Sequence, residues 1–177
     1  MKRVAVILAE GFEEIEAITP VDILRRAGVA VTSFSISNSI TVKGSHNIPV
    51  IADDLFSNFI ADDFDALILP GGQPGSANLA NDSRVINAVC AFHSANRIIA
   101  AICAAPTVLL KAGVLHGVTV TAHPSVSNLF NRLSIDGVCS SGSFITAKSA
   151  ATALNWALAI AEALNCDSNA IARSMPS

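Results

Sequence analysis

The most informative part of the sequence for the fold is Arg97-Ile-Ile-Ala-Ala-Ile-Cys103-Ala-Ala-Pro106-Thr-Val-Leu-Leu-Lys111-Ala-Gly113. The uninterrupted apolar run from Ile98 to Ile102 predicts a strand that is covered on both faces. The following segment, 104–112, predicts a helix: Pro106 suits its first turn, where no N–H is needed, and Gly113 suits its end. A buried strand that runs directly into a helix is typical of an α/β protein.

Similar patterns recur along the chain. Apolar runs predict further strands at 4–8, 29–36, 65–69 and 118–122, and helical patterns occupy 15–28, 83–95 and 149–164. The first of these helices rests on Ile15, Ile18, Val21 and Leu24, which recur at three-residue spacing. Two paired segments, 40–42 with 48–51 and 135–139 with 143–147, predict small β-hairpins. Together these elements predict a mostly parallel sheet with helices on both faces.

Composition excludes several classes of protein. The 177 residues suffice for one domain, 1–177, and the formal charge of −3 comes without any Lys/Arg cluster, which argues against a nucleic-acid ligand. The longest apolar run, from Ile98 to Leu110, contains Pro106 and is too short to span a membrane. The apolar stretch near the start is also too short for a signal peptide, so a cytoplasmic protein is expected.

Cys103 is the first candidate for chemistry. It falls where the strand meets the helix, so the helix dipole and unpaired N–H groups are expected to favour its thiolate, the nucleophilic form. The alternative is a small buried apolar residue, as most free cysteines are. Ligands of parallel sheets bind beyond the carboxyl ends of the strands. Glu10-Gly11, Gly71-Gly72 and His123 fall at such ends too, so the topology predicts that they gather with Cys103.

Glu16 is the second candidate. Pro20, four residues later, lacks an N–H and crowds the carbonyl group of Glu16, which predicts an irregular helix from which Glu16 turns inward. Beside a thiolate, Glu16 must be protonated or must share one proton with the sulfur, and it could then pass a proton to a bound carbonyl. Its neighbours Glu13 and Glu14 are interpreted as acids that complement the helix dipole.

Backbone donors and a histidine complete the predicted site. Gly71 and Gly72 follow a strand and form either an ordinary turn or an oxyanion hole completed by the N–H of Ala104. His123 precedes a proline and is therefore expected in extended backbone, either as a general base or as a polar wall of the pocket.

No cofactor or metal site is predicted. The four cysteines form no CxxC pair or zinc-finger pattern. The remaining histidines, His46, His93 and His116, are interpreted as loop or surface residues without ligand spacing.

With these residues in place, the chain resembles the DJ branch of the ThiJ/PfpI superfamily. The similar stretches lie between residues 4 and 164: Val6-Ile-Leu-Ala-Glu-Gly-Phe-Glu-Glu-Ile-Glu16, Pro20-Val-Asp-Ile-Leu-Arg-Arg-Ala-Gly28, Asp65-Ala-Leu-Ile-Leu-Pro-Gly-Gly72, Ala100-Ala-Ile-Cys-Ala-Ala-Pro106 and Thr121-Ala-His-Pro124. The resemblance implies a flavodoxin-like sandwich that forms a homodimer. It also implies a reactive Cys103 with protonated Glu16 as partner, N–H groups of Gly72 and Ala104 facing the sulfur, and His123 in the pocket.

The resemblance implies a cofactor-free, cysteine-dependent enzyme of the glyoxalase or deglycase type. Such an enzyme converts methylglyoxal, glyoxal or their adducts to hydroxy acids and protects against carbonyl and oxidative stress. The alternative is a redox sensor or chaperone-like protein whose Cys103 is oxidised to sulfinate. A Cys-His peptidase pair is disfavoured, because Ala104 stands where the protease-like branch carries histidine.

Two departures from the family pattern bear on the site. The segment 146–152, Thr146-Ala-Lys-Ser-Ala-Ala-Thr152, differs from the glycine- and proline-containing loop that borders the pocket of relatives. His46 aligns with an arginine that relatives often place in the pocket from the dimer partner, which argues against a fixed anion site there.

Overall fold

A computed structural model describes residues 1–167, 171, 173 and 175. Its main sheet has seven strands in the order β5-β2-β1-β6-β7-β9-β8, and only the β8–β9 pairing is antiparallel. The strands are β1 Arg3–Leu8, β2 Ala30–Ser35, β5 Asp54–Leu55, β6 Ala66–Leu69, β7 Ile98–Ile102, β8 Val138–Ser141 and β9 Phe144–Ala147. The mostly parallel sheet expected from the alternating pattern is therefore confirmed.

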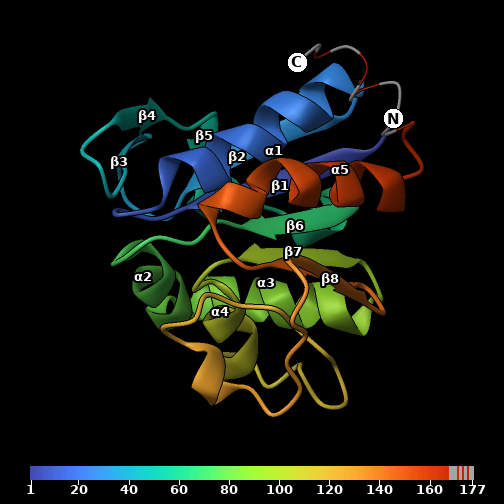
Figure 1. Cartoon of the computed structure of the whole chain (residues 1–177). Helices are drawn as coiled ribbons and strands as arrows, with labels where there is room; N and C mark the ends of the chain where they lie inside the picture. The colour runs from blue at the N-terminus through green and yellow to red at the C-terminus, as the bar shows by residue number, and fades with distance from the viewer. Residues whose placement is uncertain (168–170, 172, 174, 176–177) are drawn as a thin grey trace.

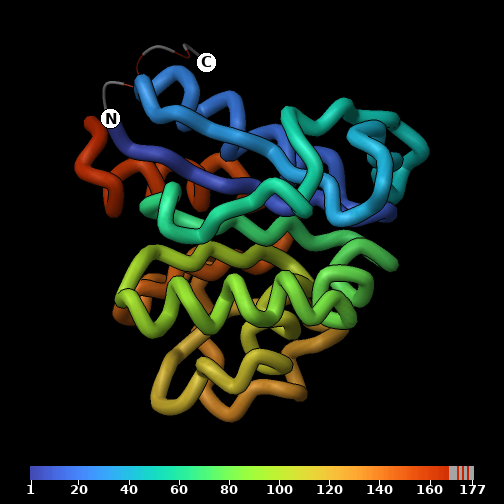
Figure 2. Tube along the Cα trace, turned by 180° about the vertical axis from the view of Figure 1, so that it is seen from behind, coloured from blue at the N-terminus to red at the C-terminus, as the bar shows by residue number. Residues whose placement is uncertain are grey.

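Helices cover both faces of this sheet (Figure 1). One layer contains α1 Glu14–Arg26 and α5 Ala153–Ala163, and the other contains α2 Gly75–Asn81, α3 Ser83–Ser94 and α4 Pro106–Lys111. Figure 2 shows α3 from behind, in yellow-green, lying across the second face. Four 3-10 turns link these elements: η1 Phe56–Asn58, η2 Ala61–Asp63, η3 Ser127–Leu129 and η4 Ala150–Thr152. None of the described helices is long and apolar enough to cross a bilayer.

The apolar runs form strands because both of their faces are buried. Every residue of β6 is buried, as are five of the six residues of β1. Their side chains alternate between two hydrophobic cores, one beneath α1 and α5 and the other beneath α3 and α4. Trp156 of α5 anchors the first core, where its indole N–H donates to the Ile145 carbonyl at 3.0 Å.

Both predicted hairpins are present. Antiparallel β3 Thr41–Lys43 and β4 Pro49–Ile51 form a separate two-stranded sheet that stands beside the N-terminal end of α1, and β8–β9 forms one edge of the main sheet. The long C-terminal helix is also present, although its first turn is the 3-10 turn η4.

Two predicted elements differ in the structure, and one helix was not predicted. The expected strand at 118–122 is reduced to a single bridge between Val120 and Leu133. Its neighbour Thr121 donates its N–H to the side chain of Thr146 at 2.9 Å, so this backbone group does not pair with a strand. Helix α4 begins at Pro106, two residues later than expected, and the short helix α2 was not predicted.

The exposed face of α1 also differs from the sequence pattern. Ile15 and Ile18 are 55% and 44% exposed, whereas Glu14, Glu16 and Ala17 are buried. Three-residue steps fall short of a 3.6-residue turn, so an apolar series at that spacing drifts around the helix. The helix itself continues through Pro20 without interruption, and the inward orientation predicted for Glu16 is confirmed.

Candidate active site

Cys103 lies at a sharp turn between β7 and α4. Its φ of 63° is in the left-handed region, which costs a residue with a Cβ roughly 1–2 kcal/mol. Two backbone hydrogen bonds hold this conformation: the Cys103 N–H donates to the Ala147 carbonyl, and the Cys103 carbonyl accepts from the His123 N–H, both at 2.8 Å. A strained conformation that its surroundings maintain is common at functional sites.

Glu16 reaches the sulfur from α1 on the other side of the turn. Its side chain is 1% exposed and is hydrogen-bonded to the side chain of Cys103. The N–H of Gly71 donates to Glu16 Oε2 at 2.9 Å. A Cβ atom on Gly71 would lie 2.4 Å from that oxygen and 2.7 Å from Cys103 Cβ. Glycine at position 71 therefore allows the carboxyl group and the thiol to meet.

The pair has unusual titration properties. Burial, followed by the negative charge of Glu13, raises the pKa of Glu16 to about 7. Burial and the charge of Glu16 also raise the pKa of Cys103, and these effects outweigh the backbone N–H groups of Gly72 and Ala104. Two negative charges in contact are strongly disfavoured, so above pH 7 the pair retains one proton and the thiolate forms when Glu16 holds that proton.

The helix dipole and unpaired N–H groups are both expected from the sequence to favour the thiolate. The N–H groups of Gly72 and Ala104 do lower the pKa of Cys103, but burial and Glu16 outweigh them. Helix α4 has six residues and begins three positions after Cys103, so its positive end is short and displaced from the sulfur. Sharing one proton with Glu16 is another way in which the sulfur can become a thiolate.

The two neighbouring glycines have different partners. The N–H of Gly72 faces the Cys103 sulfur together with that of Ala104, as the resemblance implies. The N–H of Gly71 is instead bonded to Glu16. Among the predicted oxyanion donors, Gly72 and Ala104 therefore remain available beside the sulfur, and Gly71 orients the carboxyl group.

His123 is held next to Cys103 by the backbone. Its N–H donates to the Cys103 carbonyl at 2.8 Å, its side chain is half-buried, and its Nδ1 lies 2.8 Å from the Ser125 hydroxyl. This hydrogen bond orients the ring. The two roles predicted for His123, a general base or a polar wall, both remain predictions.

The divergent segment 146–152 keeps a structural role at the site. Ala147 ends β9 and accepts the Cys103 N–H. Beyond it, Ser149 and Thr152 form a reciprocal capping box at η4.

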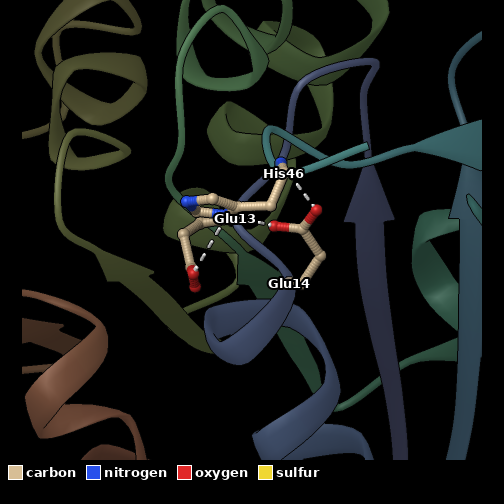
Figure 3. A group of neighbouring side chains, drawn as sticks. All are labelled: Glu13, Glu14 and His46. Carbon is tan, nitrogen blue, oxygen red and sulfur yellow. Dashed lines mark hydrogen bonds and ion pairs between the residues drawn. The ribbon is translucent and has the colours of Figure 1, made fainter. Parts of the chain in front are cut away.

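Sequence reasoning missed the group formed by Glu13, Glu14 and His46. Glu13 caps α1 by accepting the Glu16 N–H at 2.8 Å, as expected of a helix-start acid. Glu14 instead contacts the β3–β4 turn, where His46 Nδ1 lies 2.8 Å from its Oε2 (Figure 3). His46 is more than thirty positions away from Glu14, so no local spacing signals the contact.

These features define a class: three-layer α/β proteins with a strand-end cysteine paired to a buried carboxyl group. A comparison with protein families matches residues 2–163 to the DJ-1/PfpI family, and the chain belongs to that family.

Individual relatives agree with this assignment. The protein dj-1beta of Drosophila melanogaster is 39% identical over 167 residues, which cover 92% of this chain and 89% of that protein. A protein named deglycase from Pyrococcus abyssi is 33% identical over 136 residues, or 77% of this chain and 81% of the relative. The solved structure of oxidized Toxoplasma gondii DJ-1 superposes with a TM-score of 0.94 at 30% identity, covering 98% of this chain and 97% of that one.

Proposed function

We propose that the protein is a cofactor-independent enzyme of the glyoxalase or deglycase type, acting on methylglyoxal, glyoxal or their adducts. The observation that carries this proposal is the contact between the Cys103 thiol and the buried, protonatable Glu16, with two backbone N–H groups facing the sulfur. The deglycase name of the Pyrococcus abyssi relative supports it.

In the first step, the thiolate of Cys103 attacks the aldehyde carbon of methylglyoxal. The carbonyl electron pair moves onto oxygen, and the N–H groups of Gly72 and Ala104 donate to the negative charge that develops there. Protonation of this oxygen gives a hemithioacetal. Because the pair holds one proton as the thiolate forms, Glu16 begins this step as the acid.

In the second step, Glu16 moves a proton between the two carbons of the adduct. Its carboxylate removes a proton from the former aldehyde carbon and returns that proton to the neighbouring carbon. The hemithioacetal hydroxyl passes its own proton to the ketone oxygen, so the first oxygen becomes a carbonyl and the second a hydroxyl group. His123, whose backbone N–H is bonded to the Cys103 carbonyl, assists this proton transfer. The product is a lactoyl thioester, which water hydrolyses to lactate and free Cys103. One carbon is oxidised as its neighbour is reduced, so no external electron acceptor is needed.

The test is chromatographically resolved lactate formation from methylglyoxal by purified protein. Cys103→Ser should abolish turnover and Glu16→Gln should reduce it strongly, because the first lacks the nucleophile and the second lacks the transferable proton. Cys166→Ser is the matched control, since Cys166 lies beyond the end of α5 and has no place in the mechanism. Lactate formation by Cys103→Ser at the rate of the unsubstituted protein would refute the proposal.

A redox sensor is the second candidate function. In it, peroxide oxidises Cys103 to the sulfinate, which protonated Glu16 stabilises by a hydrogen bond, and the new charge alters partner binding. The similarity to a Toxoplasma gondii DJ-1 that was solved in an oxidized form favours this candidate. Mass spectrometry after mild peroxide treatment tests it: two oxygens on Cys103 are expected, whereas oxidation of another cysteine with Cys103 unchanged would exclude it.

We also propose that the protein is a cytoplasmic homodimer. Its cysteines are free thiols, which a reducing compartment preserves.

Ile15 and Ile18 of α1 are exposed, as are Ile48 and Ile51 of the neighbouring hairpin, and Ile18 and Ile51 line one shared cavity. A second copy would bury this patch. Light scattering should show a dimer that Ile18→Glu converts to a monomer, and a monomeric unsubstituted protein would exclude the proposal.

A further inference from the structure

Three side chains that can act as metal ligands lie together at the start of α1, outside the cysteine site (Figure 3). The His46 ring lies between the carboxylates of Glu13 and Glu14. Its Nδ1 is 2.8 Å from Glu14 Oε2 and 4.0 Å from Glu13 Oε1, and one atom from each residue can be chosen so that all three lie within 4.8 Å of one another.

The Glu14 carboxylate is held firmly in this arrangement. Its Oε1 accepts the N–H of His46 at 2.8 Å, and its Oε2 accepts the Ser45 hydroxyl at 3.3 Å. A Cβ atom on Gly44 would lie 2.3 Å from Oε1, so the absence of a side chain at position 44 leaves room for the carboxylate. Hydrogen bonds of this kind orient the carboxylate ligands of metal sites.

We propose that Glu13, Glu14 and His46 form a binding site for a divalent transition-metal ion of the zinc type. Protein ligands lie about 2.0–2.2 Å from zinc, which places two ligands of a tetrahedral ion about 3.4 Å apart. The observed separations, 2.8 Å on one side of Nδ1 and 4.0 Å on the other, bracket this value. For one ion to bind all three groups, the exposed imidazole ring would turn so that both distances approach this value.

The ligand types select the class of metal. Calcium and magnesium prefer six or more oxygen ligands, whereas an imidazole nitrogen with two carboxylates suits zinc and neighbouring transition metals. The His46 side chain is 69% exposed in the single chain, which leaves room for a further ligand such as water. Binding uses the Nδ1 lone pair, and the ion displaces any proton on that nitrogen into solvent.

The site is separate from the proposed catalytic chemistry but adjoins it. Glu13 accepts the backbone N–H of Glu16, whose side chain contacts Cys103. The metal would also link the first turn of α1 to the β3–β4 turn that carries His46. Because none of the proposed ligands takes part in the catalytic steps, the two proposals can fail independently.

The test is titration of tag-free full-length protein with Zn²⁺ by calorimetry and with Co²⁺ by visible absorption. One equivalent should bind, and the cobalt spectrum should lack a thiolate charge-transfer band. His46→Gln should weaken binding by at least ~10-fold, since loss of even an outer partner of a ligand costs about 10–100-fold. Circular dichroism should show that this exposed substitution leaves the fold intact.

Two variants serve as controls. Cys103→Ser and His116→Gln should bind zinc with the affinity of the unsubstituted protein, because neither residue is a proposed ligand. The first variant tests whether the thiol contributes to binding, and the second tests whether any exposed histidine would do so. Absence of zinc binding, equal affinity in His46→Gln, or loss of binding in Cys103→Ser would each overturn the proposal.

Discussion

Replacement of Glu16 by Gln should change how stability depends on pH. Glutamine has nearly the same shape and can still accept the N–H of Gly71, but it cannot ionise. Glu16 is almost fully buried, and burial together with the charge of Glu13 raises its pKa from 4.5 to about 7. The difference in unfolding free energy between the variant and the unsubstituted protein reports on Glu16 and its direct partners, because titrating groups that do not interact with Glu16 cancel.

The direction of the stability change with pH follows from the raised pKa of Glu16. Below pH 4.5 the carboxyl group is protonated in both the folded and the unfolded chain. Between pH 4.5 and 7 only the unfolded chain loses the proton, so the unsubstituted protein loses stability as pH rises, and above pH 7 the loss is complete. At about 1.4 kcal/mol per pH unit, the rise in pKa corresponds to about 3 kcal/mol. The Gln variant should gain this amount relative to the unsubstituted protein.

Urea unfolding at intervals from pH 4.5 to 8, with a metal chelator present, measures the difference. Glu162→Gln on the exposed face of α5 makes the same chemical change in solvent and should give a nearly constant difference. If the Glu16→Gln difference is also constant to within about 0.5 kcal/mol, Glu16 does not carry a raised pKa and the proton-sharing argument fails.

Three further predictions concern the site and the core. Gly71→Ala should lower kcat/KM by about 100-fold, because the added Cβ overlaps the Glu16 carboxyl group and displaces it from Cys103; steady-state kinetics would show this, and an unchanged value would contradict it. The alkylation rate of Cys103 by iodoacetamide should rise tenfold per pH unit up to about pH 7 and then level off, because the pair reacts in its singly protonated form; a rise that continues past pH 8.5 would exclude this. Trp156→Phe should destabilise the protein by about 2 kcal/mol in urea unfolding, because it opens a cavity and leaves the Ile145 carbonyl without its donor; a loss below about 0.5 kcal/mol would show that the contact is unimportant.

The sequence identified the elements whose signal is local. The run 98–102 is apolar at every position because both faces of β7 are buried, and the same reasoning located β1 and β6. The same reasoning was wrong at 118–122. The apolar composition of this segment is typical of a strand, but its backbone forms hydrogen bonds with a side chain and with a loop. The spacing of Ile15 and Ile18 correctly indicates a helix but does not identify which face of that helix the rest of the chain covers.

The order of apolar runs and turns was enough to predict a mostly parallel α/β sheet and the place of Cys103 at the carboxyl end of a strand. The protonation of the site depends instead on contacts that form only in the folded chain. The pKa of Glu16 depends on its burial and on charges through space, and its hydrogen-bond donor Gly71 is 55 positions away in the chain. The same holds for His46 beside Glu14, since the fold alone brings the β3–β4 turn to the start of α1.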